Sequence, residues 1–62
     1  ILIGEEAVVI EPIDNLLSTG RVMIRGQEWA ARSVDEKQKF KKDDVVSVVS
    51  ISGVKLMVKC PE

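Results

Sequence analysis

The chain has 62 residues, of which 45% are hydrophobic, 31% are charged and only 3% are aromatic, and its formal net charge is −1. This length allows a single domain, residues 1–62, and the near-zero net charge lacks the excess of positive charge that nucleic acid or an anionic membrane attracts. One cysteine excludes an internal disulfide and a Cys/His zinc site, and the absence of histidine removes the commonest general base. We therefore expect no catalytic residue, no cofactor and no metal.

Valine and isoleucine dominate the apolar positions, and turn-forming residues recur at short intervals. β-Branched side chains fit pleated strands better than helices. The turn-forming positions are Pro12, 14–15, 18–20, Gly26, 43–44, 52–53 and Pro61. Short apolar runs interrupted in this way predict a small all-β protein.

The first predicted strand covers residues 5–13. Its centre, 7–10, is apolar at both alternating positions, which is typical of a strand buried on both faces or bent across a barrel corner. In the loop that follows, 14–19, we expect Leu16 and Leu17 to cover one end of the core.

The second and third predicted strands, 20–25 and 28–34, are joined by a tight turn at Gly26. Alternation places Val22 and Ile24 of the second strand inside the barrel, and it places the residues that alternate with them, Arg21, Met23 and Arg25, outside. On the third strand Trp29, Ala31 and Ser33 share one face, and the large Trp29 beside the small Ala31 suits a tight interior.

The polar stretch 35–42 is predicted to be a loop or a single helical turn, held to the core by Phe40. The fourth and fifth strands, 45–50 and 54–60, form a second hairpin. The residues expected to point inward from these strands are Val46, Val48, Leu56 and Val58. We expect Cys60, near the end of the chain, to be a packing residue.

Five strands with the longest connection between the third and fourth match a five-stranded OB-type Greek-key barrel. An SH3-like barrel is the alternative.

Several residues occur in an order that resembles the C-terminal soluble domain of the NfeD family. They are Ile3-Gly4, Gly20-Arg21-Val22, residues 26–31, Val46-Ser47-Val48 and residues 51–58. These positions are turn glycines and core residues rather than reactive groups, and they extend over almost the whole chain. Asp43 stands where the family has glycine, and aspartate tolerates the left-handed backbone geometry of such a turn.

The resemblance implies an OB-type barrel attached to membrane-spanning helices, on the cytoplasmic side, with a stomatin- or flotillin-like scaffold protein as its partner. Longer members of the family carry a Ser-Lys protease domain ahead of the helices, and none of its residues carries over to this chain. The chain begins at Ile1 rather than methionine, and we expect it to be the C-terminal part of a longer membrane protein.

The candidate interaction surface is formed by the outward rows of the second and fifth strands. It comprises Arg21, Met23, Arg25, Lys55, Met57 and Lys59. Each row combines positive charge with a methionine, a flexible apolar side chain that adapts to a binding partner. Self-association through this surface is a further expectation.

An oligonucleotide-binding barrel is the alternative function, with Trp29 as a base-stacking platform. Such barrels present several aromatic residues and a basic groove, whereas this chain has one Trp and one Phe. We therefore assign Trp29 to the core. The lysines within 37–42 are bracketed by acidic pairs at 35–36 and 43–44, and we interpret this region as a solvated loop rather than a lipid or cation site.

Overall fold

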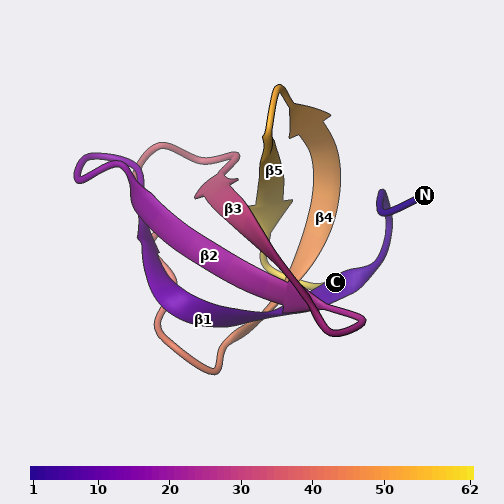
Figure 1. The fold of residues 1–62 in the computed structure, drawn as a ribbon. Helices are drawn as coiled ribbons and strands as arrows, with labels where there is room; N and C mark the ends of the chain where they lie inside the picture. Colours follow the sequence, from indigo (N-terminus) through magenta and orange to yellow (C-terminus); the bar gives the residue numbers. More distant parts are fainter.

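All five predicted strands form, each within two residues of its expected bounds. The computed structural model describes all 62 residues (Figure 1). The strands are β1 (Glu6–Asp14), β2 (Thr19–Ile24), β3 (Gln27–Ser33), β4 (Val45–Ser52) and β5 (Lys55–Lys59). No helix in the structure is long and apolar enough to cross a membrane.

The strands close into a barrel in the order β1-β2-β3-β5-β4, with β4 returning to β1. Only β3 and β5 run parallel, because the chain crosses from β3 to β4 through the long connection and then returns along β5. The other neighbouring strands are antiparallel. This strand order is that of the OB-type Greek-key barrel, and the predicted fold is confirmed.

One cluster of buried aliphatic side chains, with a single aromatic ring, fills the barrel. Its members are Ala7, Val9, Ile13, Val22, Ile24, Ala31, Phe40, Val46, Val48, Leu56 and Val58. Every residue predicted to point inward from the second, fourth and fifth strands belongs to this cluster. Trp29, assigned to the core from the sequence, is partly buried and packs against the cluster together with Leu2, without being one of its fully buried members.

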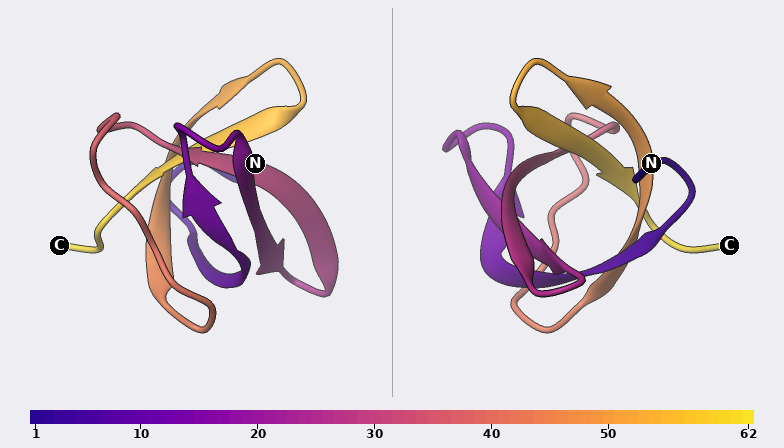
Figure 2. Two further views of the ribbon diagram at one scale, coloured as in Figure 1. Left: turned by 90° about the vertical axis from the view of Figure 1, so that its left-hand side faces the viewer. Right: turned by 45° about the vertical axis from the view of Figure 1, so that its right-hand side comes forward.

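β1 bends sharply, which explains why the residues at its centre are apolar on both faces of the strand. Its pairing with β2 shifts register between Val9 and Glu11 and again between Glu11 and Asp14. Such irregularities bend a strand and increase its twist. The first part of β1 therefore pairs with β4, while the rest follows β2 around the barrel, and the right-hand view of Figure 2 shows the curve of β1.

The first turn after β1 corrects one prediction, because Leu16 and Leu17 are 80% and 70% exposed and do not cover the core. The reason is local. The Asp14 carboxylate accepts hydrogen bonds from the backbone N–H groups of Leu16 at 3.0 Å and Leu17 at 3.3 Å. This Asx-type turn fixes the loop tip in solvent.

Phe40 and Asn15 close that end of the barrel instead. Phe40 is 5% exposed, and its backbone exchanges two hydrogen bonds with Ile13, at 2.9 and 3.1 Å. The Asn15 amide accepts a hydrogen bond from the N–H of Ser33 at 2.9 Å and donates one to its carbonyl at 2.8 Å. Phe40 is therefore the anchor predicted for the polar loop, which forms no helix.

Asp43 adopts a φ of 76°, the left-handed geometry anticipated for aspartate at a glycine position. Its neighbour Asp44 accepts a hydrogen bond from the N–H of Lys41 at 2.8 Å, and Asp35 accepts one from Lys37 at 3.0 Å. The acidic residues that bracket the loop thus act in turns, as interpreted from the sequence.

Candidate interaction surface

The two predicted rows lie on one continuous outer face, because β3 is placed between β2 and β5. Arg21 is opposite Ala30, and Ala30 is opposite Lys55. Side chains at paired positions of adjacent strands point to the same side of a sheet. The small Ala30 therefore separates two basic side chains, and the β2-β3-β5 face can be followed in Figure 1.

The two methionines of this surface do not form one apolar patch. Met23 pairs with Glu28, whereas Met57 pairs with Arg32. These two β3 residues are four positions apart, a separation of about 13 Å along the strand. The two rows are therefore separate along the face and are joined by the outer side chains of β3.

The apolar neighbours of Met23 lie on the side of β2 that faces away from β3, towards β1 and β4. Val8 is opposite Met23 in β2 and opposite Val45 in β4, and the two valines are 42% and 44% exposed. We call Val8, Met23 and Val45 the apolar stripe. The sequence did not reveal it, because Val8 lies inside the continuous apolar run of β1, where alternation does not distinguish the two faces.

Most of the cations on the surface have an acidic partner. Arg21 lies 3.2 Å from Glu28, and Lys59 lies 3.1 Å from Glu62. Lys55 takes part in none of the ion pairs of the structure. Exposed pairs of this kind contribute about 0–1 kcal/mol each, so a partner can exchange them at little cost. The near balance of charge gives this face little attraction for a polyanion.

Arg25 does not continue the β2 row, contrary to simple alternation. It occupies the β2–β3 turn with a φ of 51°, followed by Gly26 at 78°, and both positive values are typical of a type I′ hairpin. Its guanidinium pairs with Glu5, which precedes β1. Arg25 thus lies at the edge of the candidate surface rather than within it.

Arg32 shows that part of the positive charge on this face is structural. Its guanidinium donates to the carbonyl oxygens of Ser18 at 2.6 Å, Ala31 at 2.7 Å and Gly20 at 3.3 Å. These contacts satisfy backbone acceptors in β3 and where β1 turns into β2. Arg32 therefore holds the turn and is less available to a ligand.

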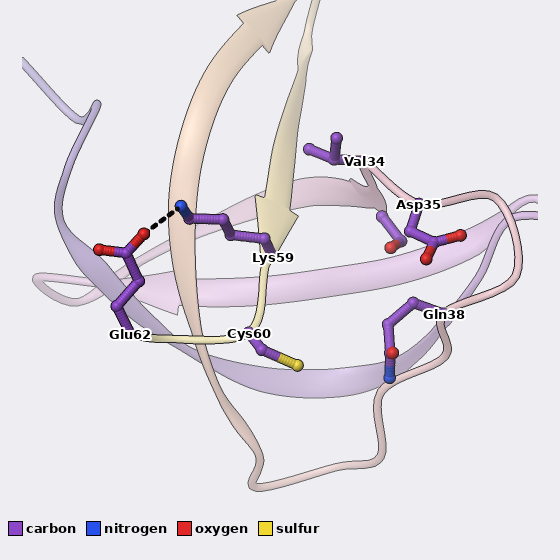
Figure 3. Close-up of a pocket in the computed structure, with 7 residues that line it drawn as sticks. Val34, Asp35, Gln38, Lys59, Cys60 and Glu62 are labelled. Carbon is purple, nitrogen blue, oxygen red and sulfur yellow. Dashed lines mark hydrogen bonds and ion pairs between the residues drawn. The ribbon is translucent and has the colours of Figure 1, made fainter.

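The single pocket of the molecule lies at the end of β5, where it shares Lys59 with the candidate surface, and its volume is about 360 Å³ (Figure 3). It is lined by Ser33, Val34, Asp35, Gln38, Lys59, Cys60 and Glu62.

Cys60 is exposed, which corrects its assignment as a packing residue, and no hydrogen bond joins it to another side chain. A nucleophile needs an adjacent base or a charge that stabilises the thiolate, and the neighbouring lysine is engaged by Glu62. No group of three His, Cys, Asp or Glu side chains is placed to hold a metal ion.

Trp29 packs against the core rather than forming an open stacking platform. It shares the inner face of β3 with Ala31, and it packs against the core cluster. Its indole Nε1 is buried and has no hydrogen-bond partner. A base-stacking role requires an open aromatic face, and the packing of Trp29 gives no support to that alternative.

Comparisons with known proteins agree with this architecture. Residues 1–59 match the family described as the NfeD-like C-terminal, partner-binding domain. The chain is similar to the soluble domain of a membrane protein implicated in regulation of membrane protease activity from Corynebacterium glutamicum. Identity is 34%, the TM-score is 0.87, and the match covers 95% of this chain and 90% of that chain.

The chain is also similar to the C-terminal domain of stomatin operon partner protein 1510-C from Pyrococcus horikoshii. Here identity is 33%, the TM-score is 0.81, and the match covers 98% of this chain and 89% of that chain. No curated protein sequence matches. Since the family match extends over nearly the whole barrel, this chain belongs to the NfeD-like C-terminal, partner-binding domain family.

Proposed function

We propose that this domain is the non-enzymatic interaction module of a membrane-anchored NfeD-like protein, and that it binds a stomatin- or flotillin-like scaffold protein. The observation that carries the proposal is the match of residues 1–59 to a partner-binding domain family. A solved structure similar to this chain is a stomatin operon partner protein. Another is the soluble domain of a membrane protein. By this proposal helices outside this chain attach the barrel to the cytoplasmic side of a membrane.

The mechanism is display of a rigid surface. A closed barrel holds its outer side chains in fixed relative positions, so little conformational entropy is lost when a partner binds. On the β2-β3-β5 face the partner meets Arg21 and Met23 at one side and Lys55, Met57 and Lys59 at the other. We assign no chemical step to any of these residues.

The test is a calorimetric titration of the chain with the stomatin-like protein from the same organism. Met23→Glu and Met57→Glu each place a carboxylate on the proposed face, and each is expected to weaken binding about tenfold or more, since desolvating an unpaired charge is costly. Leu16→Glu is the matched control, because Leu16 is an exposed apolar residue that is not part of the candidate surface. Unchanged affinity in both methionine variants would remove the face from consideration.

The oligonucleotide-binding alternative has its own test, a fluorescence titration with single-stranded DNA at low salt. Near-balanced surface charge predicts no binding in the micromolar range. Micromolar binding with a steep salt dependence would favour the alternative over a protein partner.

A further inference from the structure

The end of β4, residues 49–52, is hydrogen-bonded on only one edge. β5 pairs with it on that edge. On the other edge β1 pairs with β4 only as far as Ser47. The segment before β1 adds two hydrogen bonds at Val48: the Gly4 N–H donates to the Val48 carbonyl, and the Val48 N–H donates to the Glu5 carbonyl, both at 2.9 Å. Beyond Val48 no group of the chain bonds to this edge. Figure 1 shows the β4–β5 hairpin projecting past the other strands there.

The hairpin geometry identifies which backbone groups are unpaired. Ser52 is opposite Lys55 across a two-residue loop that begins with Gly53 at a φ of 61°. In such a hairpin the closing pair is hydrogen-bonded and the next pair is not. The next pair is Ile51 with Leu56. The N–H and C=O of Ile51 therefore point away from β5, towards the unpaired edge.

Apart from the register shift at Val49, where β4 pairs irregularly with β5, this edge lacks the features that normally prevent strand addition. Proteins protect exposed edges with charged residues, proline or a covering segment. Residues 45–52 include no charge and no proline. The apolar side chains in and beside the unpaired stretch are exposed, namely Val49 at 37%, Ile51 at 47% and Val54 at 80%, and they alternate with Ser50 and Ser52. A strand placed beside this edge gains backbone hydrogen bonds and buries apolar surface at the same time.

We propose that a partner protein adds an extended, uncharged segment to the free edge of β4 at residues 49–52. This inference rests on the proposed partner-binding function and names the contact by which it is achieved. The edge is about 13 Å long, enough for a segment of roughly four residues. The occupant is uncharged because a charged side chain beside Ile51 would be desolvated without a partner. β4 separates the added strand from β5, so the β4 contact is distinct from the β2-β3-β5 face, with Ser50 of β4 paired to Met57 on the opposite edge.

The experiment measures amide hydrogen exchange in the 62-residue chain, free and with the same stomatin-like protein at a saturating concentration. The Ile51 amide is expected to exchange rapidly in the free chain and to slow by about tenfold or more in the complex. A second measurement compares the affinity of Ile51→Lys with that of Val34→Lys. Val34 is 50% exposed at the end of β3, so this control places the same charge at similar exposure away from the edge.

Slowed exchange at Ile51, with binding weakened about tenfold or more by Ile51→Lys and little changed by Val34→Lys, supports the proposal. Binding that leaves the Ile51 amide fast and tolerates Ile51→Lys overturns the β4 contact but leaves the proposed function standing. Absence of any binding overturns both. Protection of Ile51 that rises with the concentration of the chain alone would show that a second copy takes the edge, and would overturn the assignment to a partner protein.

Discussion

Replacing Gly20 with alanine tests the packing of the barrel where β1, β2 and β3 approach one another. Gly20 is buried and has a φ of 142°, a backbone conformation that residues with a Cβ rarely adopt. An added Cβ would lie 2.5 Å from the carbonyl oxygen of Ala31, 2.8 Å from Cγ1 of Ile13 and 3.0 Å from its Cα. Two of these three atoms belong to the backbone, so no rotamer change can relieve the clash.

The expected cost has two parts. Backbone strain at such a position costs about 1–3 kcal/mol, and forcing an extra carbon into a packed interior costs about 1–3 kcal/mol. A domain of this size has only about 3–5 kcal/mol of core stabilisation to lose. Gly20→Ala is therefore expected to be largely unfolded, or to melt at least about 10 °C below the unchanged chain.

The assay is thermal unfolding followed by circular dichroism, with Gly53→Ala as the matched control. Gly53 also has a positive φ, 61°, but no atom lies within 4 Å of the position that an added Cβ would take. The control therefore carries backbone strain without the clash, and it should lose only about 1 kcal/mol. Equal destabilisation of the two variants would refute the close approach of β2 to Ile13 and Ala31.

Three further substitutions test the closed end of the barrel by chemical denaturation. Asn15→Ala removes both hydrogen bonds to the backbone of Ser33 and should cost about 1–3 kcal/mol; an unchanged midpoint would show that the pair is replaced by water. Phe40→Ala should cost about 3–5 kcal/mol, because the ring is almost wholly buried, and a loss below about 1 kcal/mol would deny its role as anchor. Ser33→Ala should be neutral or stabilising by up to about 1 kcal/mol, because the buried hydroxyl has no hydrogen-bond partner; clear destabilisation would reveal a partner that the structure lacks.

Alternation of side chains was sufficient to predict the interior of the barrel. Val22 and Ile24, and likewise Leu56 and Val58, lie in short strands without bulges, where a period of two maps directly onto inside and outside. Phe40 was predictable for a different reason, since it is the one large apolar residue in a polar loop. The long connection before β4 favoured the OB-type strand order over the SH3-like alternative.

The features missed by the sequence depend on contacts between distant residues. The Asn15–Ser33 pair joins residues 18 positions apart, and nothing local indicates it. Leu16 and Leu17 were misplaced because apolar character alone does not show that Asp14 holds their backbone in a turn. Where a strand bends, the register with its neighbour is set by three-dimensional packing.

The candidate surface shows the same limit. Sequence alternation correctly identified Arg21, Met23, Lys55 and Met57 as residues outside the core. It could not show that the two methionines are separated along β3, since that depends on the pairing of three strands. The apolar stripe formed by Val8, Met23 and Val45 depends on the register of β1 after its bend, and the free edge of β4 depends on where β1 stops pairing.

The central claim is that this barrel binds a protein partner through its outer surface and remains folded as it does so. The most direct test is an NMR titration of the isotope-labelled chain with the stomatin-like protein. The account predicts chemical-shift changes at the outward residues of β2, β3 and β5 and at the edge of β4, with the core valines unchanged. No shift change at a saturating concentration of the stomatin-like protein, or changes spread through the core cluster, would contradict it.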